Sequence, residues 1–259
     1  MALKLSTALR NSILSGRAFK YAMSNCVLKI YTGAQPSTAD AAPTGTLLCT
    51  YSDASGALTR EVLSVGSLTL SGTSGSADTF TLNGIEIMGG SVPSDGTVAG
   101  TATLVAKKIN DNPKNVYVKA STTGASGVIT LTAKPGLGSL PNTWIPAGTG
   151  TTIAFGTAVN MAGGVTAVNG LLWGDVLTGV LSKLATQTWS GVAVASGTAG
   201  WFRFEAAVAD PGALDSLEAV LRMDGSVSTS GAELNLSTTA IVNTATQTID
   251  TFTVTLPTA

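Results

Sequence analysis

The stretch TFTLNGIEIMGG, residues 79–90, carries the clearest local signal in this chain. Apolar residues alternate with threonine up to Leu82, Asn83 and Gly84 follow, and the alternation resumes at Ile85. Alternation with a period of two is typical of a half-buried strand, and Asn-Gly tolerates the two positive φ angles that a type I′ turn needs. The stretch therefore predicts a β-hairpin.

The hairpin belongs to a segment whose pattern differs from the sequence on either side. VGSLTL precedes it as a strand, TATLVAKKIND has apolar residues at helical spacing, and NVYVKAS and GVITLTA alternate again. Residues 61–165 thus predict a β-β-α-β-β domain of about 100 residues, large enough for a small core of its own. We interpret this small α+β domain as an insertion, because exposed loops of compact domains tolerate insertions.

The flanking segments, 1–60 and 166–259, predict a second, discontinuous domain that is mainly β. In the first, Ser6 is expected to cap a short helix that Gly16 ends, and CVLKIYTG and TLLCTY read as strands. These are too few strands to be stable alone. We therefore expect them to complete a sheet with the later segment.

The later segment contains many short strand patterns separated by Gly and Ser turns, which indicates a sandwich or a jelly-roll-like barrel. Its last pattern, TIDTFTVTLP, is expected to be one strand that turns Phe252, Val254 and Leu256 inward. The scattered aromatic residues Trp173, Trp189, Trp201 and Phe202 are interpreted as core or interface.

Charge is scarce and unevenly distributed. Charged residues make up 11% of the chain, against about 25% in an ordinary domain. The net charge is +4 in residues 1–60, zero in 61–165 and −5 in 166–259. Free monomers usually keep a charged surface. A surface this neutral therefore favours a protein whose surface is buried against copies of the same chain or against other partners. We expect a homo-oligomer, with a trimer favoured.

The sequence offers little for catalysis. It has no histidine, which excludes Ser-His-Asp and Cys-His arrangements and the usual zinc sites. The acidic residues that could form a catalytic pair are interpreted as a solvated loop and turn: Asp210, Asp215, Glu218 and Asp224. We expect no enzyme activity and no catalytic, cofactor-binding or metal-binding residue.

The two cysteines, Cys26 and Cys49, stand in apolar contexts and are expected to be buried. A disulfide between them stays open at this point. No apolar run approaches the roughly 18 to 20 residues of a membrane-spanning helix. Arg10 and Arg17 interrupt the apolar part of the N-terminus, so we expect no signal peptide and synthesis in a cytosol.

The N-terminal segment is the candidate interface. Its members are an apolar helix face with two neighbouring cations: Leu5, Leu9, Arg10, Ile13 and Arg17. A helix this short is marginal unless it packs. We expect it to lie against another subunit or against the acidic third segment of its own chain. Its positive charge is interpreted as a solvated face or a docking arm for an acidic protein surface, and nucleic acid is not an expected partner.

The flanking segments resemble a group of small structural proteins from the virion gene clusters of tailed bacteriophages and prophages. The residues that carry the resemblance are LKIYTGAQP and GTLL early in the chain, then SGTAGWFRF and DGSVSTSGAELNLSTTAIVNTATQTIDTFTVTLP. It covers roughly residues 1–55 and 170–259. It implies a virion component made in the host bacterial cytoplasm, with capsid decoration as the preferred role and the major capsid protein or other virion proteins as partners.

The inserted segment departs from that pattern. Its order of DTFTLNGIEI, LVAKKIN and VITLTA resembles, more loosely, a β-α-β module that recurs in phage tail and surface proteins. A tail, baseplate or fibre protein is therefore an alternative. A receptor-binding or glycan-binding module carried by the insert is another, although its aromatic residues look mostly like core: Phe80, Tyr117, Trp144 and Phe155.

Overall fold

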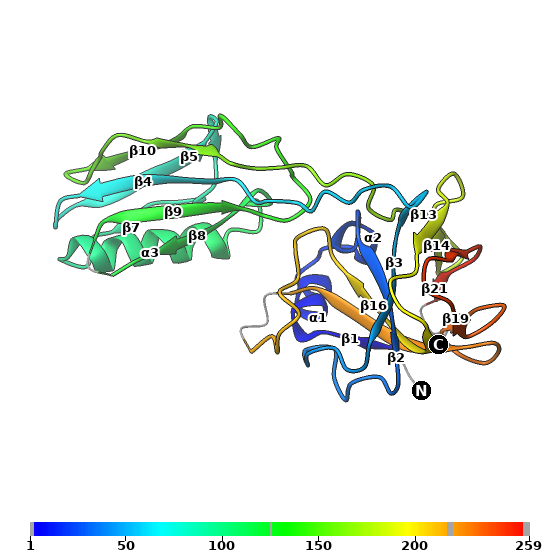
Figure 1. Ribbon diagram of the computed structural model, residues 1–259. Helices are drawn as coiled ribbons and strands as arrows, with labels where there is room; N and C mark the ends of the chain where they lie inside the picture. The colour runs from blue at the N-terminus through cyan, green and yellow to red at the C-terminus, as the bar shows by residue number, and fades with distance from the viewer. Residues whose placement is uncertain (1–2, 125, 217–219, 256–259) are drawn as a thin grey trace. The chain divides into compact units, whose positions relative to one another are not determined.

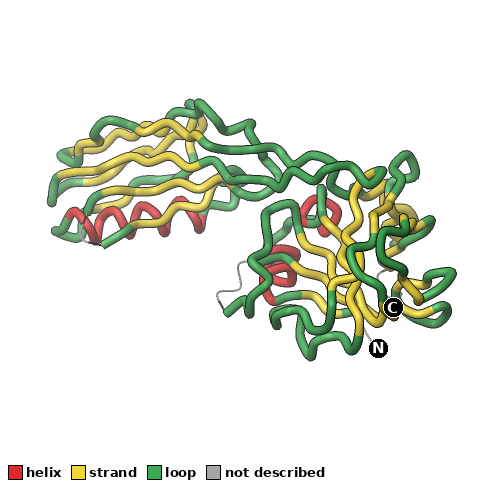
Figure 2. The backbone as a smooth tube through the Cα atoms, in the orientation of Figure 1, coloured by secondary structure: helices red, strands yellow, loops and turns green. Residues whose placement is uncertain are grey.

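The computed structural model is mainly β, as predicted, and its mostly antiparallel sheets give a β-sandwich-like fold (Figures 1 and 2). The described residues are 3–124, 126–216 and 220–255. The chain divides into two compact units. Unit 1 comprises Met1–Arg60 and Ala167–Ala259, and unit 2 comprises Glu61–Thr166.

Unit 1 consists of short strands and two short helices. Its elements are β1 (Lys4–Leu5), α1 (Thr7–Leu14), α2 (Phe19–Ala22), β2 (Val27–Thr32), β3 (Leu47–Asp53), β13 (Trp173–Leu177), β14 (Val180–Lys183), β15 (Trp189–Val192), β16 (Gly197–Glu205), β17 (Arg222–Ser228), β18 (Leu234–Asn235), β19 (Ala240–Ile241), β20 (Thr246–Ile249) and β21 (Thr253–Thr255).

The main sheet of unit 1 joins the two flanking segments of the chain. Its strand order is β1-β17-β16-β2-β3-β15-β20, with β18 added beside β17 and β19 beside β16. Strands β2 and β3 come from the first segment and lie in the middle of strands from the second. The expected pairing of the two segments in one sheet is therefore observed. A smaller sheet, β13-β14-β21, also belongs to unit 1.

Aromatic rings fill the core of unit 1. Phe252 lies 5.1 Å from Phe204, 5.5 Å from Phe202 and 5.9 Å from Trp173, measured between ring centroids. Trp189 is fully buried beside them. Such edge-to-face and tilted contacts add to the stabilisation from apolar burial. Trp173, Trp189 and Phe202, interpreted as core or interface, belong to this core, whereas Trp201 is buried on the opposite face of β16, stacked on Tyr31.

Helix α1 begins as the sequence predicts. The Ser6 hydroxyl accepts a hydrogen bond from the Leu9 amide at 3.2 Å, which satisfies one of the free donors of the first turn. The helix ends at Leu14, and Gly16 follows with φ +95°, a left-handed conformation that glycine adopts without strain.

Unit 2 combines two antiparallel sheets with one helix. Its elements are β4 (Val65–Ser71), β5 (Ser76–Leu82), β6 (Ile85–Glu86), β7 (Val92–Pro93), α3 (Val98–Asp111), β8 (Val118–Thr122), β9 (Val128–Ala133), β10 (Pro146–Thr151), β11 (Ala154–Phe155) and β12 (Val159–Ala162). One sheet has the order β10-β5-β6 with β7 beside β5, and the other has the order β11-β4-β9-β8 with β12 beside β4.

Helix α3 packs on strands β8 and β9, and its apolar face closes the core of unit 2 (Figure 1). Val105 and Ile109 on that face are fully buried. The bounds of unit 2 lie within one residue of the predicted insertion. Its ability to fold alone stays a prediction.

The predicted hairpin forms between β5 and β6. Leu82 pairs with Ile85, and the turn residues Asn83 and Gly84 have φ +51° and +80°. Two positive φ angles in a two-residue loop are the signature of the type I′ turn.

Two expectations about strands need correction. The pattern at 248–257 is not one strand, because β20 ends at Ile249 and β21 begins at Thr253 and joins a different sheet. Phe252 between them is buried, whereas Leu256 lies outside the described residues. Strands β10–β12 were not expected, since PAGTGTTIAFGTAVNMA shows little apolar alternation.

Candidate functional site

The strongest candidate site is a cluster of charged side chains on the face of the main sheet opposite the aromatic core. Strand β16 alternates Phe202 and Phe204, which point into the core, with Arg203 and Glu205, which point to the other face. Strand β17 places Arg222 and Asp224 on that same face. The antiparallel register sets Arg203 beside Asp224 and Glu205 beside Arg222.

Arg203 and Asp224 form a two-bond ion pair that is closed to solvent. The Arg203 Nε and Nη2 atoms donate to the two Asp224 oxygens at 2.8 and 2.7 Å, and both side chains are 0% exposed. Burial raises the pKa of Asp224, and the hydrogen bonds and charge of Arg203 offset only part of that rise. Within the described residues, the buried Nη1 of Arg203 has no hydrogen-bond partner.

Arg222 and Asp210 form a second buried pair. Nε and Nη2 of Arg222 donate to Asp210 at 2.6 Å each. Burial by itself raises the pKa of Asp210, but the hydrogen bonds from Arg222 and the Gly212 amide, together with the charges of Arg222 and Arg203, outweigh it and hold that pKa below its usual value. Arg222 also donates to main-chain carbonyls, those of Asp40, Ala41 and Ala213, at 2.8 to 3.2 Å.

A third set of charges surrounds Glu205. Its carboxylate accepts from Lys29 Nζ at 2.6 Å and lies 3.5 Å from Arg60 Nη2. Arg60 also donates to the carbonyls of Ala206 and Val208 at 2.8 Å each. Lys29 is opposite Arg203 in the register of β2 and β16, so the charges continue across three strands.

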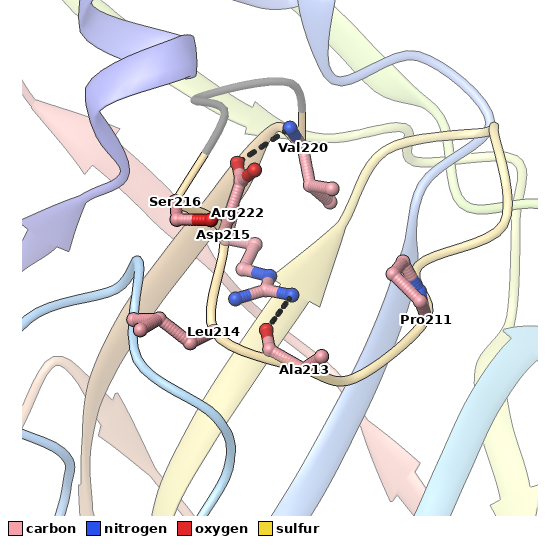
Figure 3. A pocket seen from close by; sticks show the side chains of 7 residues that line it. All are labelled: Pro211, Ala213, Leu214, Asp215, Ser216, Val220 and Arg222. Atoms are coloured by element: carbon pink, nitrogen blue, oxygen red, sulfur yellow. Dashed lines mark hydrogen bonds between the residues drawn. The ribbon is translucent and has the colours of Figure 1, made fainter.

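A crevice of about 220 Å³ lies beside this cluster (Figure 3). Its lining residues come from the loop before β17 and from β17 itself: Pro211, Ala213, Leu214, Asp215, Ser216, Val220 and Arg222. Figure 3 shows Arg222 directed at the Ala213 carbonyl, to which it donates at 2.8 Å. Asp215 accepts a hydrogen bond from the Val220 amide at 2.7 Å.

The chemistry of this crevice is structural. Each nitrogen of the Arg222 guanidinium donates to an oxygen of the chain itself, so the cation is already neutralised by Asp210 and shared among carbonyls. Arg222 thereby ties the loop around Asp40 and the loop around Ala213 to strand β17. This arrangement holds two surface loops in place.

The structure places the four acidic residues interpreted as solvated differently; they are Asp210, Asp215, Glu218 and Asp224. Asp224 and Asp210 form the buried ion pairs, so the solvated interpretation is wrong for both. Asp215 is also buried, and Glu218 lies outside the described residues. The overlooked signal was Arg222 and Asp224 flanking Met223, a charged pair in a strand pattern whose middle residue enters the core.

The structure distributes the five candidate interface residues between core and surface. Leu9 is fully buried in the core of unit 1, and Leu5 and Ile13 pack against that core. Arg10 is exposed and donates to the Thr7 hydroxyl, and Arg17 donates to the Tyr21 carbonyl. The apolar face of α1 thus packs against the core of its own chain, and its contact with another subunit stays a prediction.

The side chains of this region that remain accessible are partly different from those predicted. Leu14 at the end of α1 is 85% exposed and Tyr21 in α2 is 67% exposed, next to Arg10 and Arg17. Leu14 was missed because helical periodicity around Leu9 and Ile13 gave no reason to single it out.

Cys26 and Cys49 are both buried and unpaired, so the open question of a disulfide is answered in the negative. Burial raises the pKa of Cys49 to about 11 and that of Cys26 further. Across residues 3–124, 126–216 and 220–255, no three Asp, Glu or Cys side chains gather in a way that could hold a metal ion.

Two comparisons bear on identity. The sequence matches no family model, and a search of curated proteins returns no match. None of the helices in the described parts of the chain is both long and apolar enough to span a membrane.

Proposed function

We propose that this chain is a non-enzymatic structural protein of a tailed-bacteriophage virion, and that it decorates the capsid by binding its lattice. The observation that carries the proposal concerns the segments that resemble virion proteins. LKIYTGAQP supplies β2, SGTAGWFRF supplies β16, and these strands are paired over six positions, from Ala199 with Thr32 to Glu205 with Val27. Segments that are about 170 residues apart in the chain thus build one sheet, as they would if they descended from one small protein.

The charge distribution supports a binding role. The buried pairs around Arg203, Glu205 and Arg222 use up most charges of the main sheet inside unit 1. The exposed surface of unit 1 is rich in Ser, Thr and apolar side chains. Such a surface can be covered by a partner at little cost in desolvated charge.

The proposed mechanism is mechanical. Unit 1 binds across junctions between capsid subunits, and the surface of α1 and α2 with Arg10, Leu14 and Tyr21 reaches a neighbouring acidic surface. A stable contact of this kind buries about 1,600 Å². Repetition of the contact over many lattice sites adds avidity. Decoration of this type stabilises a shell without any chemical step.

Placement in a tail, baseplate or fibre is the competing proposal, since unit 2 resembles modules of such parts. The glycan-binding alternative has less support. Phe80 is fully buried, Phe155 packs on it at 5.9 Å, and Tyr117 and Trp144 pack on each other at 5.5 Å against the core of unit 2.

Immunogold labelling of purified phage particles, with an antibody raised against the full chain, tests the proposal. Gold on the heads is expected. Gold on the tails would replace decoration by the competing placement. Particles without gold, and without the peptides of this chain in mass spectra, would overturn the virion role altogether.

A further inference from the structure

Strand β20 ends the main sheet of unit 1 and leaves one of its edges open. It pairs with β15 through Trp189–Ile249 and Gly191–Gln247. Of the strands within the described residues, no other pairs with it. An open edge offers unpaired amide and carbonyl groups that can extend the sheet with another strand.

The register identifies which groups are open. The Ala193 amide donates to Ala245, and the Ala54 amide donates to Thr188, so odd-numbered residues of β15 face β20 and even-numbered residues face β3. Gln247 and Ile249 therefore direct their main chains at β15. Thr246 and Thr248 direct theirs away from the sheet, and both are exposed.

Two other edges among the described strands, those at β8 and β1, are blocked or short. In unit 2, the edge strand β8 is closed by Asn110, whose side chain donates to the Ala120 carbonyl and accepts from the Ala120 amide, both at 2.8 Å. In unit 1, the opposite edge β1 is two residues long and carries Lys4. Short, charged or covered edges prevent strand addition. Strand β20, with the sequence TQTI, is four residues long, and it carries no charged residue and no proline.

The open edge itself carries no charged residue from Thr244 to Ile249. Val192 pairs with Thr246 and is 50% exposed, and Val194 and Val242 beside it are 61% exposed each. The nearest charge along the strand is Asp250, which follows it. Like charges directly opposite each other destabilise a strand pair, and β20 brings none of its own to a pairing with a second copy.

We propose that β20 is a self-association edge, where it pairs antiparallel with β20 of a second copy of this chain around a twofold axis at Gln247. Thr246 of one copy then exchanges hydrogen bonds with Thr248 of the other, and the reverse. An antiparallel edge matches itself in this way, because each outward residue offers one donor and one acceptor. Asp250 falls opposite Thr244, away from the other Asp250. The inference stands apart from the proposed virion role.

The register gives a sharp test by cross-linking. In the proposed pairing, the Cα atoms of the two Gln247 residues lie about 4.5 Å apart, within disulfide range. The full chain with Gln247→Cys should form a disulfide-linked dimer under mild oxidation. Thr251→Cys is the matched control, because its counterpart lies about 26 Å away at 3.3 Å per residue. The native Cys26 and Cys49 are buried and do not compete.

A second pair of variants tests the main-chain contacts. Thr248→Pro removes one outward amide at a position where an edge strand tolerates proline, and Thr248→Val keeps it. Sedimentation should show a dimer for the wild type and for Thr248→Val, and at least a tenfold weaker dimer for Thr248→Pro. The proposal fails if the wild type stays monomeric across the concentration series. It also fails if Gln247→Cys cross-links no better than Thr251→Cys, which decides the matter should Thr248→Pro not fold.

Discussion

At the scale of the residue, Arg222 shows how unit 1 accommodates a buried guanidinium. Its burial disfavours the charge, but hydrogen bonds and attraction from Asp210 outweigh this and raise the pKa of Arg222 above its ordinary value. The carbonyls of two loops take up the remaining donors. The Arg222–Asp210 pair holds those loops in place, but it adds little net stability. The cost of removing both charges from water offsets much of the attraction between them.

Replacing Arg222 with methionine should strongly destabilise unit 1. The change leaves Asp210 buried without its partner, and such uncompensated charges cost about 3 to 5 kcal/mol. Urea unfolding of the full chain, followed by tryptophan fluorescence, measures the loss. The exposed Arg10→Met is the matched control and should change stability by less than about 0.5 kcal/mol. Equal losses in the two variants would contradict this role of the Arg222–Asp210 pair.

The cysteines should be inert in the folded chain. A thiol reacts as its thiolate, and burial raises the pKa of Cys49 to about 11, so little thiolate forms at neutral pH. We expect no reaction with a thiol reagent at pH 8 over an hour, and reaction of both cysteines in denaturant. Rapid labelling of either residue in the native protein would show that its strand opens readily.

At the scale of the element, features with a local cause are predictable from a few neighbouring residues. The Asn83-Gly84 turn and the Ser6 cap depend on residues within a few positions, so their sequence was enough to predict them. The buried ion pairs depend on the register of β16 with β17, which no local pattern contains. The break between β20 and β21 likewise arises because each joins a different sheet.

The hairpin turn of unit 2 offers a test of local strain. Asn83 has φ +51°, and a β-branched residue resists this conformation, so Asn83→Val should cost about 1 to 3 kcal/mol. Asn83→Gly, which accepts that φ, is the control and should cost little. Hydrogen exchange should rise within residues 61–166 alone. Equal loosening around Phe252 would mean that the two units share one unfolding transition.

The start of helix α3 should make unit 2 sensitive to acid. The Asp95 carboxylate accepts hydrogen bonds from the Thr97 amide at 2.9 Å and from the hydroxyls of Thr97 and Thr101. The hydrogen bond from the Thr97 amide is the chief reason that the pKa of Asp95 is lowered. Because the pKa of Asp95 is lower in the folded chain than its ordinary value of 3.8, the ionised carboxylate stabilises the fold at pH values above 3.8. This stabilisation is lost as the pH falls through the lower pKa of the folded state. Asp95→Asn should therefore melt earlier than wild type near pH 6, and the difference should vanish at low pH. A constant difference down to pH 2 would contradict the assignment.

At the scale of the whole molecule, the chain combines two compact units with separate apolar cores. The division follows from composition and pattern, because the insert has its own helix, its own strands and no net charge. Which surfaces meet partners does not follow from the sequence. The N-terminal segment illustrates this, since the apolar residues predicted as an interface are used within the chain and Leu14 is exposed instead.

Removal of residues 61–165, with a short Gly/Ser linker in their place, should leave unit 1 folded. The strands of its main sheet all lie outside the deleted segment, and so does its aromatic core. Circular dichroism and the fluorescence of the buried Trp189 should stay native-like. An insoluble or unfolded product would refute the interpretation of unit 2 as an insertion.

The most direct test of the proposed role is a cryo-electron microscopy comparison of two particles, one wild type and one with this gene deleted. We expect the wild type to show density on the outer capsid lattice that fits unit 1, with the α1 surface against a neighbouring subunit. This density should be lost from the deletion particle. Identical capsid density in both particles would contradict capsid decoration.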